Sequence, residues 1–487
     1  MNRKMVFYML GRIIMLEAVL MVLPLLCGII YHEKSVFSFL ITMAIALSLG
    51  FIISLINKTK DKTIFAKEGF VTVALAWISM SAIGALPFVI SGEIPSYTDA
   101  FFETVSGFTT TGASVAADVE SMSRSILFWR SFTHWIGGMG VLVLVMAILP
   151  TDTGRTIHIM RAEMPGPIVG KLVPRIKDTA KILYLIYIVM TIIQIILLLC
   201  GGMPLFDSIV HSLGTAGTGG FGIKGDSITG YSPYCQWVIA IFMLLFGINF
   251  NLYYLLLLRK VRSVLKSEEL WFYIALVVAA VTAISIDIYP MYQSLSEAVR
   301  QSAFQVASII STTGYATTDF NLWPTLSKTL LLFLMFVGAC AGSTAGGFKV
   351  SRVVLLLKQI RSNLRHMVHP RSVDSIKLEG KKVDNSTIIN VTTYLALYAL
   401  CFASTFILIS LFDEFDLETN ISAAASCFNN IGPGFSLVGP MSSYAAYSII
   451  SKWVLSAAML LGRLEILPMI LLFAPSAWIK NKNGIKA

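Results

Sequence analysis

Four glycine-containing stretches decide how this chain folds: SGFTTTGAS at residues 106–114, GTGGFG at 217–222, STTGYAT at 311–317 and NNIGPGFS at 429–436. Each closes a longer segment that begins near an acid and continues as a helix-compatible run, at 98–114, 205–222, 294–316 and 417–435. A bilayer core needs about 20 apolar residues per crossing helix, so these segments are too short to cross, and they are too apolar for solvent-exposed loops. They predict re-entrant units, which are tolerated at membrane depth only inside protein or beside a water-filled cavity.

The composition around these stretches is that of a polytopic membrane protein. Hydrophobic residues make up 56% of the 487 residues and charged residues only 13%, whereas soluble domains carry about 25% charged residues. Collagenous, disordered and disulfide-stapled secreted chains are excluded by the same numbers. Apolar runs long enough to cross a bilayer lie near 6–30, 35–56, 69–91, 125–150, 180–201, 233–258, 269–290, 325–360, 387–412 and 446–479.

The charge distribution orients the chain in the membrane. Most of the 37 basic residues lie in six short stretches between apolar runs, at 1–12, 57–68, 151–181, 259–266, 349–382 and 480–487. Acids occupy the intervening loops. The positive-inside rule places the basic set, and therefore both termini, in the cytoplasm. The net charge of +10 is thus explained by orientation, and no nucleic-acid partner is predicted.

The four short segments form an internal repeat. With Gly112, Gly219, Gly314 and Gly432 taken as the common glycine, the separations are 107, 95 and 118 residues. Each unit starts and ends on the same side of the membrane, so the repeats are parallel and surround one axis. We predict an all-α membrane protein with four M–P–M repeats (membrane helix, re-entrant pore helix with filter loop, membrane helix) around one pore. The predicted boundaries are 1–62 for an N-terminal hairpin, and 63–165, 166–266, 267–382 and 383–487 for the repeats.

The loops have the composition of a cation filter. Four backbone carbonyls per layer can replace the water shell of a monovalent cation, and glycine adopts the positive φ that aims carbonyls at an axis. A preceding hydroxyl adds a further oxygen. The candidate potassium ligands are Thr110, Thr111 and Gly112 in the first repeat, Thr218, Gly219 and Gly220 in the second, Thr312, Thr313 and Gly314 in the third, and Asn430, Ile431 and Gly432 in the fourth.

This fourfold pattern resembles the Trk/Ktr/HKT superfamily of potassium transporters. The extra N-terminal hairpin and the length make the chain most similar to the TrkH-type bacterial membrane subunit, over nearly its whole length. The resemblance implies potassium uptake across a bacterial inner membrane, a homodimer, and a cytoplasmic, TrkA-like nucleotide-binding regulatory subunit on the basic loops. One departure is that only one glycine is common to all four loops, whereas potassium channels carry two per filter.

Two further features match this family. The run GACAGSTAGG at 338–347 is weak as a helix because of its glycines, and the resemblance makes 338–348 an intramembrane gate containing Gly342, Ser343, Thr344, Ala345, Gly346 and Gly347. Close helix packing through small residues is the competing interpretation. Arg463 lies within the last apolar run, where a charge is costly. It is a positive barrier in the pore, one half of a structural salt bridge with a carboxylate such as Glu465, or both.

Other function classes stay open or are disfavoured. A sodium- or proton-coupled potassium symporter is the nearer alternative to a channel. An enzyme is not predicted, because no Ser/His/Asp, HExxH or paired-aspartate motif appears at the membrane centre. No organic cofactor is expected in this chain, and His366 and His369 lack the cysteine or acid partners of a metal site. Potassium at the filter residues is the one metal that the sequence predicts.

Overall fold

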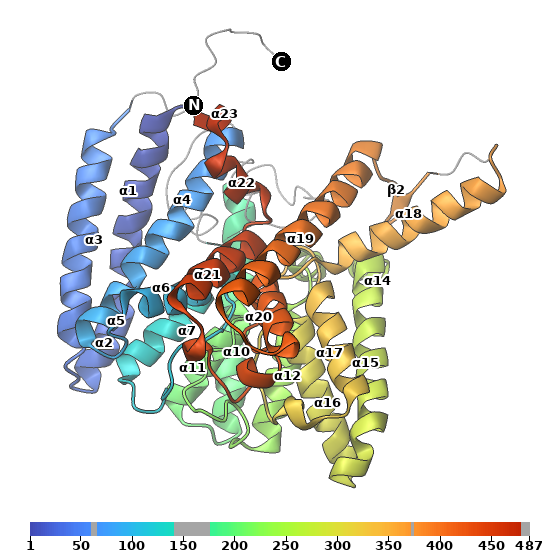
Figure 1. Cartoon of the computed structure of the whole chain (residues 1–487), viewed down its shortest axis with the longest axis horizontal. Helices are drawn as coiled ribbons and strands as arrows, with labels where there is room; N and C mark the ends of the chain where they lie inside the picture. The colour runs from blue at the N-terminus through green and yellow to red at the C-terminus, as the bar shows by residue number, and fades with distance from the viewer. Residues whose placement is uncertain (60–65, 141–175, 372–374, 479–487) are drawn as a thin grey trace.

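The computed structural model describes residues 1–59, 66–140, 176–371 and 375–478 (Figure 1). In the described part the regular secondary structure is helical except for one antiparallel pair, β1 (Lys377–Leu378) with β2 (Lys381–Lys382). The predicted boundaries at 62/63 and 165/166, most of the basic stretch 151–181 and the stretch 480–487 lie outside the described residues.

The N-terminal part is a group of long apolar helices. It contains α1 (Arg3–Leu20), α2 (Val22–Ile30), α3 (Val36–Ile56), α4 (Ala66–Gly84) and α5 (Leu86–Ser91). Helix α1 packs along both α3 and α4. A Cβ on Gly11 would lie 2.6 Å from the Gly50 carbonyl oxygen, and one on Gly50 would lie 2.7 Å from the Gly11 oxygen. The small residues therefore let two backbones approach closely, as is common between membrane helices.

By length and composition, six described helices could cross a membrane. They are Arg3–Ile30, Val36–Ile56, Lys67–Ser91, Ala180–Cys200, Glu268–Tyr292 and Asn385–Phe412, and a seventh arises if α12 (Pro233–Phe246) and α13 (Phe250–Leu257), bent by 91°, count as one span. The run predicted at 325–360 is interrupted between α17 (Thr325–Val337) and α18 (Val350–Val368). The run predicted at 446–479 is also broken, because Glu465 and Ile466 take positive φ values of 56° and 63°. It forms α21 (Ile449–Arg463), α22 (Leu467–Phe473) and α23 (Pro475–Trp478).

Four short, buried helices occupy the segments singled out in the sequence. They are α6 (Tyr97–Phe108), α11 (Leu205–Gly217), α16 (Leu295–Ile310) and α20 (Leu417–Asn429). Local capping explains where three of them begin. The side chains of Ser96, Ser294 and Asp416 accept hydrogen bonds from backbone N–H groups in the first turn, which satisfies donors that the helix leaves unpaired.

The short helices pack in a closed cycle with the longer ones. Helix α11 contacts α7 (Arg124–Gly138), α16 contacts α12, α20 contacts α17, and α6 contacts α21. Each short helix also contacts helices of its own neighbourhood in the chain, including α10 (Ile176–Cys200), α15 (Glu268–Tyr292) and α19 (Asn385–Phe412). The remaining elements are α14 (Val261–Leu265) and the 3₁₀ turns η1 (Phe320–Leu322), η2 (Ser436–Val438) and η3 (Tyr444–Ala446). The cycle brings the ends of the four short helices together.

The two ends of the described chain meet. Arg3 donates a hydrogen bond from Nη2 to the Trp478 carbonyl oxygen at 2.8 Å, and its guanidinium lies 6.0 Å from the Trp478 ring centroid. Figure 1 shows α23 next to the N-terminus, and α18 projecting away from the helical body. The N-terminus and residue 478 therefore lie on the same face of the molecule.

Candidate functional site

Each short helix ends in the same cap. We call Thr110–Gly112 loop 1, Thr218–Gly220 loop 2, Thr312–Gly314 loop 3 and Asn430–Gly432 loop 4. In every loop the first residue donates its N–H to the carbonyl three residues earlier, and the second donates to the carbonyl five residues earlier, at 2.8–3.3 Å. This pair of bonds is the Schellman motif of helix C-termini. Its fourfold recurrence makes the three positions of the loops equivalent.

The first position of each loop is conformationally strained. Thr110, Thr218, Thr312 and Asn430 have φ values of 56°, 56°, 55° and 57°. The left-handed conformation costs an L-residue about 1–2 kcal/mol, and it is a genuine outlier for β-branched threonine. Strain of this kind persists where surrounding packing over-determines it, and it clusters at functional sites.

The third position joins the loops into a ring. Gly112, Gly220, Gly314 and Gly432 all have positive φ, between 76° and 103°. A Cβ added to Gly112 would lie 1.9 Å from the carbonyl oxygen of Gly219 in loop 2, and one added to Gly220 would lie 2.0 Å from that of Thr313 in loop 3. A Cβ added to Gly314 would lie 2.0 Å from the carbonyl oxygen of Ile431 in loop 4, and one added to Gly432 would lie 2.7 Å from that of Thr111 in loop 1. Each glycine thus rests against the middle carbonyl of the next loop, and the fourth closes on the first. A side chain at any of them would push two loops apart.

The ring corrects one alignment drawn from the sequence. Gly219 was the expected counterpart of Gly112, but the structure gives that place to Gly220. Gly219 does not take a positive φ and stands at the middle position with Thr111, Thr313 and Ile431. The sequence alone could not distinguish the two adjacent glycines, because one follows Thr218 directly and the other follows it after one residue.

Polar side chains connect the loops behind the ring. Asn430 donates from Nδ2 to the Thr111 hydroxyl at 3.0 Å and to the Met459 carbonyl at 2.9 Å, which links loop 4 to loop 1 and to α21. The hydroxyls of Thr109 and Thr111 lie 2.8 Å apart. Loop 3 repeats this pair with Ser311 and Thr313 at 2.7 Å. Asn430 therefore serves as a cross-link at the place where the other loops carry threonine.

A cavity of about 330 Å³ borders the ring, and Gly112, Gly220, Gly314 and Gly432 all line it. A buried ion pair holds its wall. Arg130 donates from Nε to Glu103 at 2.8 Å, from Nη2 to the Ser114 hydroxyl at 3.0 Å and from Nη1 to the Gly222 carbonyl at 3.3 Å. One side chain on α7 thereby ties α6 to the segments that leave loops 1 and 2. Breaking such a buried pair is costly, because a charge is left uncompensated.

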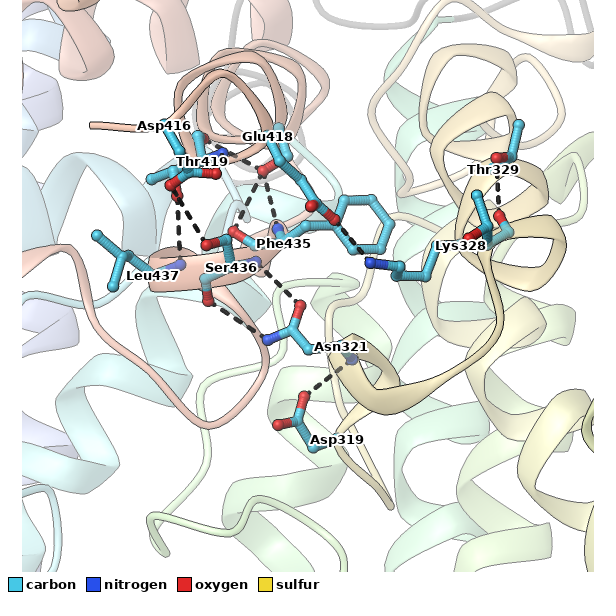
Figure 2. A network of polar contacts seen from close by, with 12 residues as sticks. Asp319, Asn321, Lys328, Thr329, Asp416, Glu418, Thr419, Phe435, Ser436 and Leu437 are labelled. Atoms are coloured by element: carbon cyan, nitrogen blue, oxygen red, sulfur yellow. Dashed lines mark hydrogen bonds and ion pairs between the residues drawn. The ribbon is translucent and has the colours of Figure 1, made fainter. Parts of the chain in front are cut away.

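A second polar network joins the segments that leave loops 3 and 4 (Figure 2). The Asn321 amide accepts from the Ser436 N–H at 3.0 Å and donates to the Ser436 carbonyl at 3.3 Å. The Nζ of Lys328 on α17 lies 3.0 Å from Oε1 of Glu418 on α20, which forms an ion pair. Asp416, at the start of α20, accepts from the Thr419 hydroxyl and from the Thr419 N–H, and these bonds lower the pKa of its carboxyl from the ordinary value of 3.8.

The glycine-rich segment 338–348 lies against loops 3 and 4. Gly346 donates its N–H to the Thr312 hydroxyl at 2.7 Å, and a Cβ on Gly346 would lie 2.5 Å from the Asn429 oxygen. Gly342 and Gly347 take positive φ values of 68° and 76°, so the segment is a loop and not a continuation of α17. Of the two interpretations of this segment, the loop geometry disagrees with simple helix packing through small residues.

Arg463 donates hydrogen bonds to backbone carbonyls of two distant segments. It donates from Nη1 to Thr344 at 2.7 Å, and from Nη2 to Gly137 at 2.6 Å and Gly138 at 2.8 Å. A small cavity of about 20 Å³ is lined by Arg463, Lys349, Glu465, Gly346 and other residues of the segment. Glu465, the carboxylate suggested for a structural pair with Arg463, instead has its Oε1 2.7 Å from Nη2 of Arg352 on α18. Glu465 itself follows the end of α21 and takes a positive φ of 56°.

Sequence reasoning missed several residues that support the ring. Four of them are buried cations: Arg130, Lys349, Arg352 and Lys452. The Nζ of Lys452 lies 2.7 Å from Oδ1 of Asp99. Each was visible as a charge within or beside an apolar run, which is the signal that drew attention to Arg463. The cap residues Thr110, Thr218, Thr312 and Asn430 were named as ligands, but their left-handed conformation was expected only of glycine.

Comparison with known proteins assigns this architecture to a family. The family model described as TrkH, cation transport protein, matches residues 35–482. The chain is 38% identical to the Trk system potassium uptake protein TrkH of Salmonella typhimurium, covering 96% of this chain and 98% of the relative, and 36% identical to TrkG of Escherichia coli, covering 98% of each. The crystal structure of the potassium transporter TrkH from Vibrio parahaemolyticus matches with a TM-score of 0.87 at 33% identity, over 98% of this chain and all of that chain. The chain belongs to the TrkH family of cation transport proteins.

Proposed function

We propose that the chain takes up potassium across a bacterial inner membrane through a gated, channel-like pore, with loops 1 to 4 as the selectivity filter. The observation that carries the proposal is the closed ring, in which four loops share one cap and each glycine rests on the next loop's carbonyl. The relatives are named as potassium uptake proteins, which supports potassium as the transported ion. We propose no organic cofactor.

The architecture in this proposal is an N-terminal hairpin at 1–62 and four M–P–M repeats at 63–165, 166–266, 267–382 and 383–487. The short helices α6, α11, α16 and α20 act as pore helices. The closed cycle of helix contacts supports this arrangement. Their C-termini, which carry the partial negative charge of the helix dipole, then face the permeating cation.

The cap geometry explains how the loops could bind potassium. In a trans peptide unit the C=O points away from the N–H. Because the N–H groups of the first two loop residues bond back to the pore helix, the carbonyls of the same peptide units, such as those of Thr109 and Thr110 in repeat 1, point away from that helix. Four such layers around one axis would replace the hydration shell of the ion.

Two elements control conduction in this proposal. The segment 338–348, with Gly342, Ser343, Thr344, Ala345, Gly346 and Gly347, is the gate on the cytoplasmic side of the filter. Arg463 is a positive barrier that also holds the gate through Thr344. These roles are not exclusive, since one guanidinium can carry a charge into the pathway while its donors are engaged.

Orientation and partners complete the proposal. We propose that both termini are cytoplasmic, in a multi-pass protein surrounded by lipid. The contact between Arg3 and Trp478 supports a common side, and the basic stretches favour the cytoplasm. The basic residues of α18 and the β1–β2 hairpin, including the exposed Lys381 and Lys382, suit a cytoplasmic, TrkA-like nucleotide-binding regulatory subunit. We further propose a homodimer and no nucleic-acid partner.

The test is electrophysiology of the purified protein in lipid bilayers with potassium on one side and sodium on the other. The proposal predicts single-channel currents whose reversal potential follows the potassium gradient. Saturable uptake that stops without a sodium or proton gradient would instead establish the coupled symporter. A reversal potential indifferent to the exchange of potassium for sodium would remove the filter assignment.

A further inference from the structure

A completely buried histidine lies between loop 1 and loop 2. His134 is on α7, and its side chain is 0% exposed. Its Nδ1 lies 2.8 Å from the carbonyl oxygen of Gly107 in the last turn of α6, and its Nε2 accepts the N–H of Phe221 at 3.3 Å. A carbonyl oxygen can only accept and an N–H can only donate, so Nδ1 carries the proton and Nε2 the lone pair. The imidazole is therefore neutral and bonded at both nitrogens to backbone.

The same ring explains why loop 2 alone contains two adjacent glycines. A Cβ on Gly219 would lie 2.2 Å from both Cγ and Nδ1 of His134. The other loops have Thr111, Thr313 and Ile431 at this position. Since Gly219 does not take a positive φ, its backbone conformation does not require glycine; the space taken by the imidazole does. His134 thus stands where the middle residue of loop 2 would otherwise carry a side chain.

The bond to Phe221 reaches the ring of loops through one peptide unit. The N–H of Phe221 and the C=O of Gly220 belong to the same planar trans peptide and point in opposite directions. Holding the N–H on Nε2 therefore sets the direction of the Gly220 carbonyl. The Phe221 side chain is held as well, because its ring centroid lies 4.3 Å from that of His134 and 4.2 Å from the Arg130 guanidinium carbon.

We propose that His134 is a positioning residue for cation selectivity, which acts by fixing the Gly220–Phe221 peptide of loop 2. The inference rests on the proposed function, since it assigns His134 a role in the filter proposed above. It differs from a packing role, because it requires a hydrogen-bond acceptor at the place of Nε2 and not only a filled volume.

Two amide side chains of different length separate these roles. In His134→Gln the amide oxygen can reach the place of Nε2 and accept the Phe221 N–H, whereas in His134→Asn the shorter amide reaches only the place of Nδ1. Both variants keep a polar, planar side chain, and the folded state of each is checked by size exclusion and melting temperature. We expect the potassium-to-sodium permeability ratio to stay within about twofold of wild type in His134→Gln and to fall about tenfold in His134→Asn, the range of one lost hydrogen bond. Equal ratios in the two variants would overturn the inference.

A size exchange gives a second, independent test. Gly219→Thr restores the residue of loops 1 and 3 and should reduce the yield of folded protein, because it collides with the imidazole. In the His134→Ala background the same substitution should recover folding, while the permeability ratio stays low because Phe221 still lacks its acceptor. A double variant with the wild-type ratio would show that His134 only fills space.

The wild-type recording separates failure of this inference from failure of the proposed function. A wild-type protein without preference for potassium over sodium removes both. A potassium-selective wild type with equal His134→Gln and His134→Asn ratios removes only the role of His134.

Discussion

The backbone N–H of Gly346 donates to the hydroxyl of Thr312 at 2.7 Å, and this bond joins the glycine-rich segment directly to loop 3. Both residues are buried, and Thr312 is one of the four left-handed cap residues. The residue that shapes the C-terminus of α16 thus also contacts the segment 338–348. Under the proposed function, a change in the gate would reach the filter through this side chain.

Replacing Thr312 with valine should loosen the gate. Valine keeps the shape and the β-branch but removes the acceptor, so the closed state loses one hydrogen bond, and basal potassium flux into proteoliposomes should rise about two- to tenfold. Thr110→Val is the matched variant: it makes the same change at the same loop position, and the Thr110 hydroxyl has no hydrogen-bond partner among the described residues. An equal rise in flux in both variants would contradict a specific link between Thr312 and the gate.

Serine at Gly112 or Gly314 should damage selectivity. Its Cβ would meet the Gly219 oxygen at 1.9 Å or the Ile431 oxygen at 2.0 Å, so neighbouring loops must move apart. We expect the potassium-to-sodium permeability ratio to fall about tenfold or more, a loss of about 1.4 kcal/mol or more of discrimination. Gly92→Ser is the control, because Gly92 has the same φ of 80° as Gly112 but has nothing within 4 Å of the added Cβ. Ratios for Gly112→Ser and Gly314→Ser that match this control would exclude both glycines from the filter.

Arg463 offers a test that separates its charge from its hydrogen bonds. At about 6 Å and an effective dielectric constant near 20, a fixed positive charge raises the barrier for a cation by roughly 2–3 kcal/mol before screening. Arg463→Gln removes the charge and should increase potassium flux, whereas Arg463→Lys keeps the charge but loses the forked donors that bind three carbonyls. Single-channel conductance rising only in the glutamine variant fits the barrier. If both variants conduct more, Arg463 acts chiefly by holding Thr344 and the segment around it.

Asp416 should give the protein a specific sensitivity to acid. Hydrogen bonds from Thr419 hold its folded-state pKa below 3.8, so the unfolded state binds the proton more readily. The stabilisation is present above pH 3.8 and is lost as the pH falls through the folded-state pKa. Asp416→Asn keeps a helix-capping side chain but does not titrate. The difference in melting temperature between wild type and variant, measured from pH 6 down to pH 3, should be constant at first and then shrink; a constant difference throughout would contradict the assignment.

Local sequence properties predicted much of the fold. The membrane class was predicted from apolar composition alone. The four short helices were predicted from run length, from an acid near each start and from a glycine shortly after each run. These signals act within a few residues of each other, so one sequence is enough to read them. The breaks at 338–349 and after Arg463 were only partly visible. Glycines marked the first, whereas the positive φ values of Glu465 and Ile466 have no local signal.

The details of the candidate site depend on contacts between distant residues. Asn430 and Thr111 are hydrogen-bonded across 319 positions of the chain, and Arg463 reaches Gly137 across 326. The absence of a side chain at Gly219 is explained only by His134, which comes from a helix more than 80 residues earlier. By itself the sequence predicted an apolar membrane protein with four short helices, each ending in a glycine-containing loop. Only the tertiary structure decided which carbonyl each glycine meets and which partner each cation finds. The physical reason is that a buried polar group is costly unless it is paired, and the partner is whichever group packing brings near.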